Sequence, residues 1–254
     1  MNETSGGKRS RGKSGCLIPL VVSAVGLVVL MLIALRPPVD DAVAQARAID
    51  LKNRGRGVWA AILIANNERE AQGLPPVWPD DVQYGNPPQP MQWQSAAQYF
   101  RYLMSAKNYT GDPRQAVPVN VPEERIVPDL NPDMLSGAGV PNAPTVEEFS
   151  DRYCAWHVAR VGQNTRMIVP FLISKNVHLQ GGSLELHGDG ETLMTLDRTP
   201  PFGRKRVVWI TLGGGCFDAR AKYISESRFF GYDERDYAYS GTTNRIDVIP
   251  CRQR

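Results

Sequence analysis

The sequence predicts an α+β fold in which a long N-terminal helix, made of a membrane anchor and an amphipathic half, packs on an antiparallel β-sheet. Three observations indicate this fold. An uncharged apolar stretch lies at residues 16–35, a helical pattern of apolar residues follows it, and short β-rich runs fill the last hundred residues. A long helix first and consecutive strands last are typical of an α+β protein rather than of alternating βαβ units.

The charge of the chain is concentrated at its N-terminus. There are 29 Lys and Arg residues against 26 Asp and Glu, a formal net charge of +3, and the basic leader at residues 1–15 accounts for the whole excess. The remaining chain is neutral, which argues against a nucleic-acid-binding surface. A hydrophobic content of 42% excludes wholesale disorder, and four Cys in 254 residues exclude a disulfide scaffold.

Residues 16–36 are predicted to form a transmembrane helix. Cys16 to Leu35 contains no charged residue, and 20 residues of helix span the hydrocarbon core of a bilayer, about 30 Å. A cleaved secretory signal is a poorer interpretation because its apolar core is shorter, about 7–15 residues. The basic leader should stay in the cytoplasm. We therefore expect a single-pass membrane protein with residues 36–254 outside the cytoplasm, which in a Gram-negative-type cell means an inner-membrane protein with a periplasmic C-terminal domain.

Residues 37–73 are expected to continue this helix as an amphipathic segment, because apolar residues recur there at three- and four-residue steps. Gly55 and Gly57 each disfavour the helix by about 1 kcal/mol relative to Ala, which marks its weakest point. The Gly-Leu-Pro-Pro sequence at residues 73–76 ends it.

Residues 74–144 are interpreted as a Pro-rich insertion, since they contain 13 of the 20 prolines and cannot form regular helix or central strand. A short helix embedded in long surface loops is predicted near residues 93–107, where aromatic and apolar residues follow a helical period. Thr145 and Glu148 have capping-box spacing and predict the start of a further helix.

Residues 145–254 are expected to form a β-rich periplasmic domain. Two glycine-containing turns, at residues 187–190 and 213–215, are predicted between its strands. The predicted β-rich runs lie at residues 154–161, 167–174, 183–186, 191–196, 206–212 and 245–249.

The N-terminus resembles the prepilin-type leader of type IV pilins and type II secretion pseudopilins. A basic leader ends at Gly15, an apolar helix begins at Cys16, and Pro37 is the twenty-second residue counted from Cys16. In this class a membrane prepilin peptidase cuts after the glycine, and the long helix often carries a proline at that place. The resemblance implies that Gly15 and Cys16 flank a cleavage site, that Pro37 kinks the helix, and that its distal half packs on an antiparallel sheet.

The resemblance covers about half of the chain, with departures at three positions. Leu20 stands where the class usually has a Glu that neutralises the N-terminal amine of a neighbouring subunit. Cys16 stands where the class usually begins with Phe or Met, and Pro19 is unusual at the fourth place. The segments similar to bacterial type II secretion-like proteins lie at residues 48–76, 153–156, 169–177 and 201–217.

The resemblance implies a non-catalytic, membrane-anchored subunit of a type II secretion or type IV pilus-like assembly. Its partners would be the membrane, pilin-like subunits or secretion machinery, and a prepilin peptidase. Two alternatives stay open: a single-pass periplasmic binding or scaffold protein of the same architecture that never enters a fibre, and an anchored periplasmic enzyme.

The residues predict no catalytic, cofactor or metal site. Cys154-x-x-His157 lacks the second Cys pair of a zinc site, and residues three apart on a strand point to opposite faces, which disfavours a Cys–His dyad. The acidic run at residues 233–236 is a possible Ca²⁺ ligand set, but a solvated loop explains it better because alternating ligands at regular offsets are absent.

Three cysteines, Cys154, Cys216 and Cys251, would face an oxidising periplasm, and an odd number leaves room for at most one bridge among them. Sequence alone does not fix the connectivity. We expect the pair Cys216–Cys251.

Overall fold

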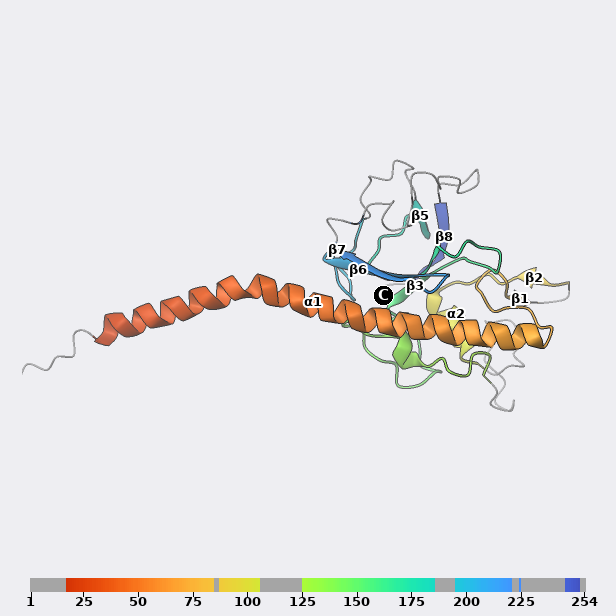
Figure 1. Ribbon diagram of the computed structural model, residues 1–254, viewed down its shortest axis with the longest axis horizontal. Helices are drawn as coiled ribbons and strands as arrows, with labels where there is room; N and C mark the ends of the chain where they lie inside the picture. The colour runs from red at the N-terminus through yellow and green to blue at the C-terminus, as the bar shows by residue number, and fades with distance from the viewer. Residues whose placement is uncertain are drawn as a thin grey trace, which may run out of the picture. The chain divides into compact units, whose positions relative to one another are not determined.

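The structure is a computed structural model that describes residues 17–84, 87–105, 125–185, 195–220, 224 and 245–251. The chain divides into two units, residues 1–43 and residues 44–254 (Figure 1). The helices and strands are, in chain order, α1 (Leu17–Ala71), β1 (Gln83–Tyr84), β2 (Gln89–Pro90), α2 (Ala96–Leu103), the 3₁₀ helix η1 (Pro132–Leu135), β3 (Trp156–Ala159), β4 (Pro170–Ser174), β5 (Ser183–Glu185), β6 (Arg206–Thr211), β7 (Cys216–Arg220) and β8 (Arg245–Ile249).

Helix α1 is continuous over Leu17–Ala71, so the two helical segments predicted from the sequence belong to one helix of 55 residues. It runs through Pro37, where the kink remains a prediction, and it is unbroken at Gly55 and Gly57. It ends two residues before the predicted end. Gly73 adopts a φ of +68°, the left-handed conformation that commonly terminates helices, and this explains the end of α1.

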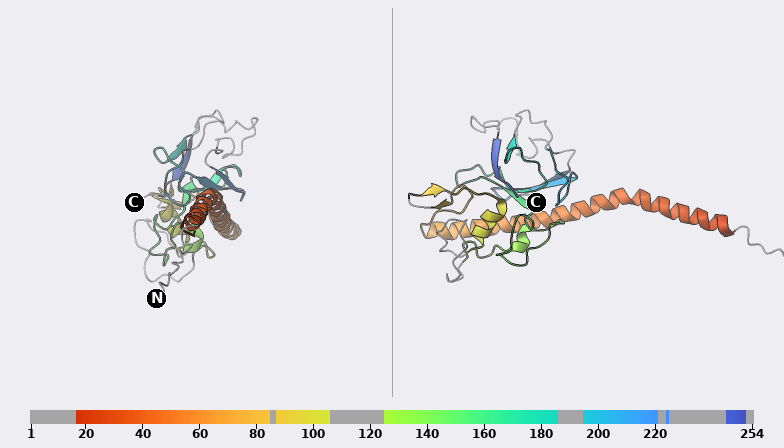
Figure 2. Two further views of the ribbon diagram at one scale, coloured as in Figure 1. Left: turned by 90° about the vertical axis from the view of Figure 1, so that its left-hand side faces the viewer. Right: turned by 180° about the vertical axis from the view of Figure 1, so that it is seen from behind.

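Six strands form one antiparallel sheet in the order β5-β8-β3-β4-β6-β7. Strands β5 and β8 lie side by side toward one edge, as Figure 2 also shows, and β7 lies at the other edge. Every residue of β3, β4 and β6 is buried, so both faces of the central strands are covered. The second half of α1 packs on this sheet, which confirms the predicted α+β fold.

Five of the six predicted β-rich runs contain a strand, namely β3, β4, β5, β6 and β8. The run at 191–196 lies mostly outside the described residues, as does the predicted turn at 187–190. Strand β7 is absent from the predictions. Its Asp218 and Ala219 have low β-propensity, and the strand is held by backbone pairing with β6 along its whole length.

Helix α2 confirms the short helix predicted near residues 93–107, and it lies in the core rather than among surface loops. Ser95 caps its start, because the Ser95 hydroxyl accepts a hydrogen bond from the Gln98 N–H at 3.3 Å. Its fully buried side chains are Ala96, Tyr99, Phe100 and Leu103. The described parts of the Pro-rich segment therefore contribute to the same hydrophobic core as α1 and the sheet.

The prediction of a helix that starts at Thr145 is wrong. The Thr145 hydroxyl accepts the expected hydrogen bond from the Glu148 N–H at 3.3 Å, but only turns follow it. The chain bends instead, so that Phe149 is buried and the Asp151 carboxylate accepts a hydrogen bond at 3.1 Å from the N–H of Ala97 in α2. Tertiary contacts here override a local helix signal.

Gly55 is the point where the backbone of α1 lies against the sheet. A Cβ atom at this position would lie 2.8 Å from both Ile210 Cγ1 and Trp156 Cζ2. Trp156 is fully buried in β3, so its ring has no free space into which to move. A Cβ atom at Gly57 would meet nothing closer than Met134 Sδ, at 3.7 Å. Of these two glycines, only Gly55 is required by close packing.

The β6–β7 hairpin packs against α1 through a tryptophan and a glycine turn. Trp59 Nε1 donates a hydrogen bond to the Leu212 carbonyl at 2.8 Å. Gly214 has a φ of +82°, and a Cβ atom there would lie 2.7 Å from the Trp59 ring. The turn predicted at residues 213–215 is confirmed. Glycine at position 214 allows both the positive φ of the backbone and the close approach of the Trp59 ring.

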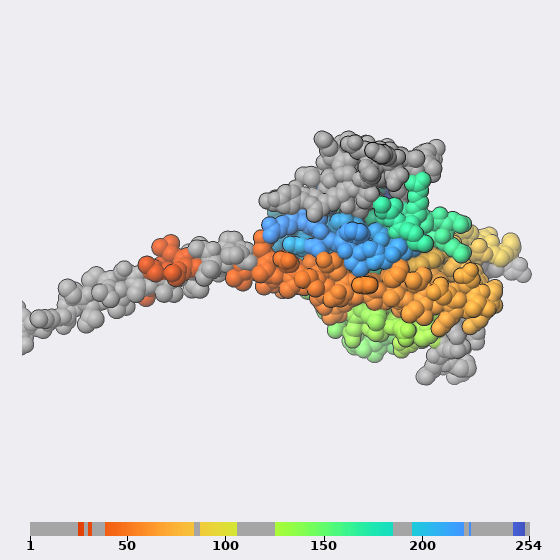
Figure 3. Space-filling model, viewed as in Figure 1, coloured from red at the N-terminus to blue at the C-terminus, as the bar shows by residue number. Residues whose placement is uncertain are grey.

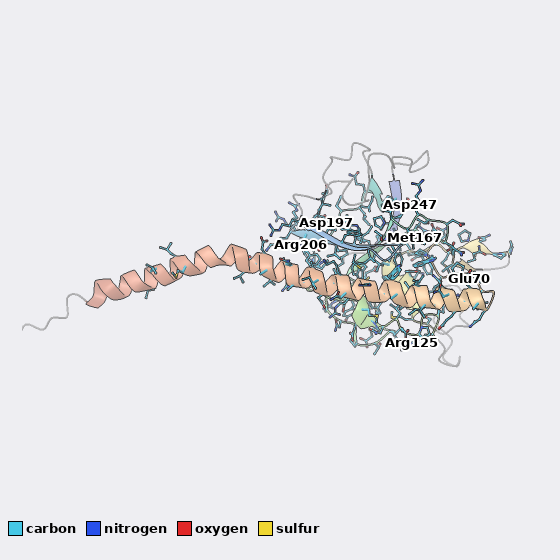
Figure 4. All side chains as sticks on the ribbon, viewed as in Figure 1. Glu70, Arg125, Met167, Asp197, Arg206 and Asp247 are labelled. Atoms are coloured by element: carbon cyan, nitrogen blue, oxygen red, sulfur yellow. The ribbon has the colours of Figure 1, made fainter. Side chains whose placement is uncertain are left out.

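The carboxylate of Asp218 in β7 forms ion pairs with one cation from α1 and one from β6. It accepts a hydrogen bond from Lys52 Nζ at 2.6 Å and another from Arg206, which is labelled in Figure 4. The Lys52, Asp218 and Arg206 side chains are 25%, 19% and 10% exposed. Solvent therefore screens these ion pairs less than it would screen a pair on the open surface.

Asp218→Asn is expected to destabilise the protein by about 1–2 kcal/mol, because two partly buried cations then lose their shared carboxylate. Asp50→Asn is the matched control, since it removes a more exposed pair with Arg54 within α1, worth about 0.5 kcal/mol or less. Urea unfolding of both variants at low and high salt measures the difference. An equal loss in the two variants would contradict the role assigned to Asp218.

Candidate functional site

Two of the sites predicted from the sequence lie outside the described residues. These are the cleavage site at Gly15 and Cys16 and the acidic run at residues 233–236. Their roles stay predictions. Pro37 lies inside α1, as reported above.

The first part of α1 presents exposed apolar side chains. Val25, Leu27, Leu30 and Met31 are between 57% and 68% exposed. Over the part of the chain that the structure describes, no helix combines the length and the hydropathy that a membrane crossing requires. Large apolar side chains on successive turns of a helix mark a surface for lipid or for another protein.

The second part of α1 has one face on the core and one face on solvent. Leu51, Val58 and Ile62 are fully buried against the domain, whereas Ile49 and Ile64 are each 49% exposed. Figure 3 shows the outer side of this part of α1 as a strip of surface between the blue strands and the green segment near residues 125–150. Within residues 44–71, α1 is thus both a core element and a surface element.

A small apolar patch surrounds the β6–β7 turn. Met167 is 67% exposed, Ile168 40% and Phe217 47%, and Met167 is labelled in Figure 4. The Met167 carbonyl accepts a hydrogen bond from the Gly213 N–H at 2.7 Å, which places this segment against the turn. Phe217 stacks on Trp209 with a centroid distance of 5.5 Å. Three exposed apolar side chains are ordinary on a protein surface and do not by themselves mark a binding site.

Cys154, His157 and Cys251 form a buried cluster where the end of β8 meets the start of β3. His157 Nδ1 accepts a hydrogen bond from the Cys251 N–H at 2.9 Å, and Nε2 lies 3.3 Å from the Val177 carbonyl. Since Nδ1 is an acceptor, the proton of the neutral ring sits on Nε2 and is donated to Val177. His157 therefore joins three segments of chain.

Burial decides the protonation of this cluster. It lowers the pKa of His157 to about 4, below its usual value of 6.5, although the hydrogen bonds to the carbonyls of Val177 and Lys175 act in the opposite direction. A hydrogen bond with Cys154, together with burial, raises the pKa of the Cys251 thiol well above its usual value. The imidazole and the Cys251 thiol are thus neutral at pH 7, unlike an activated thiolate nucleophile.

The fold separates the two cysteines of the predicted Cys216–Cys251 disulfide. Cys154, Cys216 and Cys251 are all free, and Cys216 begins β7 whereas Cys251 follows β8. Strands β3, β4 and β6 lie between β7 and β8, which puts the two cysteines about 19 Å apart at the usual strand spacing. A disulfide needs Cα atoms within about 7 Å.

The other described histidine does not join this cluster. His178 Nδ1 lies 3.1 Å from the Asp197 carboxylate, and both side chains are more than a third exposed. Among the described residues, no group of three or more His, Cys, Asp or Glu side chains is arranged to hold a metal ion.

Sequence reasoning placed Cys154 and His157 together but did not single out Cys251, rather than Cys216 or another histidine, as their neighbour. The signal that connects the three residues is the pairing of β3 with β8, in which Val158 lies opposite Ile249. Strand order of this kind is set by long-range contacts, and the β-rich runs in the sequence carry no mark of it.

Comparisons of the chain with protein-family models, with curated proteins and with solved structures find no match. The fold itself has a pilin-like layout, namely a long N-terminal helix whose second half lies on an antiparallel sheet of six strands.

Proposed function

We propose that the protein is a non-catalytic, membrane-anchored subunit of pilin-like architecture that serves a type II secretion or type IV pilus-like assembly. The observation that carries this proposal is α1, one 55-residue helix with exposed apolar side chains in its first part and a sheet domain packed on its second part. A pilin-like subunit needs these two properties, and it needs no catalytic residue.

The sequence supports a bacterial inner-membrane location. Cys16 to Leu35 carries no charge and follows a basic leader, which orients the N-terminus toward the cytoplasm and the domain toward the periplasm. In the bilayer, lipid covers side chains such as Leu30 and Met31. In an assembly, helices of neighbouring subunits replace these lipid contacts by protein contacts, so the same apolar surface serves both states.

The packing of α1 on its own domain also suits this function. Gly55 lies against Trp156, Trp59 bonds to the β6–β7 hairpin, and Asp218 binds Lys52. A force that moves the helix is therefore transmitted to the sheet domain through packed and hydrogen-bonded contacts. A subunit that an assembly machine extracts from the membrane requires such a connection.

One observation favours a second candidate function. Leu20 stands where pilins usually carry a Glu that pairs with the terminal amine of a neighbour. A subunit without this carboxylate lacks one of the interactions that hold neighbours in register. A single-pass periplasmic scaffold of the same architecture, which never enters a fibre, has no need of that interaction.

Leader cleavage separates the two candidates. The full chain is expressed with and without a prepilin peptidase, purified in detergent and measured by intact mass. The pilin-like function predicts loss of residues 1–15 only when the peptidase is present. Gly15→Val is the control variant, and it should keep the leader under both conditions.

Cross-linking of the cleaved protein in membranes then tests assembly. Ladders of dimers and larger multiples that require the assembly ATPase support the subunit function. An intact leader in the presence of the peptidase, with only monomers after cross-linking, would support the scaffold and reject the fibre subunit.

A further inference from the structure

Cys154 and Cys251 lie together at one end of two neighbouring strands. Cys154 precedes β3, Cys251 follows β8, and β3 and β8 pair antiparallel. Cys251 Sγ lies 3.2 Å from the Cys154 carbonyl, and the two residues are 2% and 0% exposed. The strand pairing thus holds the two side chains in one buried place.

The surroundings of the two thiols are already fixed by other contacts. The Cys251 N–H is held by His157 Nδ1 at 2.9 Å, and the Cys251 thiol lies 3.2 Å from the Asp151 carbonyl. The Cys154 thiol lies 3.3 Å from the Trp156 carbonyl. Each thiol donates only a weak hydrogen bond to a carbonyl, so replacing two S–H groups by one apolar S–S bond costs little in this site.

Cys216 is excluded from this pair. It lies at the opposite edge of the sheet, it is partly exposed, and its thiol lies 3.4 Å from the Gly214 carbonyl. Of the three cysteines in the domain, the structure therefore selects one pair and leaves the third cysteine as a free thiol.

We propose that Cys154 and Cys251 form a disulfide when the chain folds in an oxidising compartment, and that this bond ties the end of β8 to the start of β3. The inference goes beyond the proposed function, because it requires an oxidant and neither leader cleavage nor assembly.

The oxidant is an external disulfide of the glutathione class. The thiolate of one cysteine attacks a sulfur of that disulfide, forms a mixed disulfide and releases one reduced thiol. The second cysteine then attacks the protein sulfur of the mixed disulfide, forms the Cys154–Cys251 bond and releases a second reduced thiol. The two protein thiols lose two electrons and two protons, and the external disulfide gains both. Because the native site is buried, the exchange takes place before the cluster closes or during its local opening.

The bond closes a loop of about 100 residues that contains all six strands of the sheet. Such a cross-link stabilises the folded protein mainly by restricting the unfolded chain. If β8 and β3 separate locally, the bond keeps the end of β8 close to the start of β3 and so favours re-pairing of the two strands.

The test uses the full chain in detergent with Cys16→Ser and Cys216→Ser, so that only the proposed pair remains. The protein is refolded with oxidised and reduced glutathione, digested without reduction and analysed by mass spectrometry. We expect a cross-linked peptide pair that joins Cys154 to Cys251, no thiol that reacts with maleimide in denaturant, and a lower Tm after reduction. The matched control adds Cys154→Ala and Cys251→Ala, and its Tm should not respond to reductant.

The disulfide bonds of the wild-type chain are mapped in the same way. The proposal is overturned if Cys154 and Cys251 remain reactive thiols after refolding with oxidised glutathione, if the bridge joins Cys216 to either of them, or if reduction leaves the Tm unchanged. None of these outcomes depends on prepilin peptidase or on fibre formation, so a failure here is distinct from a failure of the proposed function.

Discussion

Gly55→Ala should destabilise the protein by about 2 kcal/mol, whereas Gly57→Ala, two residues away in the same helix, should stabilise it by up to about 1 kcal/mol. Both substitutions raise the helix propensity of α1 by about the same amount. They differ in what the new methyl group meets. At residue 55 it would lie 2.8 Å from the buried Trp156 ring and from Ile210, and at residue 57 its closest contact is 3.7 Å.

The opposite signs follow from overpacking. A methyl group that does not fit forces the helix away from the sheet or pushes the Trp156 ring off its packed position, at a cost of about 1–3 kcal/mol that exceeds the gain in helix propensity. Urea unfolding monitored by circular dichroism gives both free energies on the same scale. If Gly55→Ala is as stable as Gly57→Ala, then the close packing of α1 on the sheet does not hold in solution.

This pair of glycines also shows what the sequence predicts and what it does not. Local reasoning treats both residues as equal defects of a helix, since each lacks a side chain and disfavours helical backbone. The structure makes one of them a packing requirement, because Trp156 is more than 100 residues away in sequence and lies under Gly55. Propensity describes a residue and its near neighbours, whereas this constraint comes from a distant strand.

The elements with strong periodicity were predictable. Helix α1, helix α2 and five of the strands follow from apolar patterns and from the turn residues around them. The errors lie where tertiary contacts decide. Strand β7 forms because β6 offers it a backbone partner, and the segment after Thr145 turns because Phe149 is buried and Asp151 binds α2.

For the candidate site as well, one part could be predicted from the sequence and another part could not. Because the N-terminal segment is apolar in composition, hydropathy alone predicts the exposed apolar surface of α1. The cysteine pair depends on strand order, which places β8 beside β3 and sends β7 to the far edge. Hydropathy and spacing favour neither Cys154 nor Cys216 as the partner of Cys251.

His157 should make the stability of the protein depend on pH between about 6.5 and 4. Its folded-state pKa is lowered by burial to about 4, whereas the unfolded chain has the ordinary value of 6.5. The unfolded chain therefore takes up a proton first as the pH falls. The contribution of His157 to the free energy of unfolding is fully present above pH 6.5. It is lost progressively as the pH falls to about 4, and it changes little below that. A shift of this size corresponds to about 3 kcal/mol.

His157→Gln is the matched variant, because it keeps polar groups at the site but does not titrate. It should be less stable than the wild type at pH 7, since an amide cannot reproduce both hydrogen bonds of the ring. Its free energy of unfolding should vary less with pH by about 3 kcal/mol between pH 7 and pH 4.

The difference between the two proteins isolates His157 from the carboxyl groups. Burial raises the pKa values of Asp80 and Asp81 in the folded protein. The folded state therefore binds more protons at these two carboxyl groups than the unfolded state, and their contribution to stability rises as the pH falls. In the wild type this partly offsets the effect of His157. Urea unfolding of both proteins at a series of pH values gives the difference directly. Parallel curves would mean that His157 titrates alike in the folded and unfolded chains, and the buried contact between β3 and the end of β8 would then be wrong.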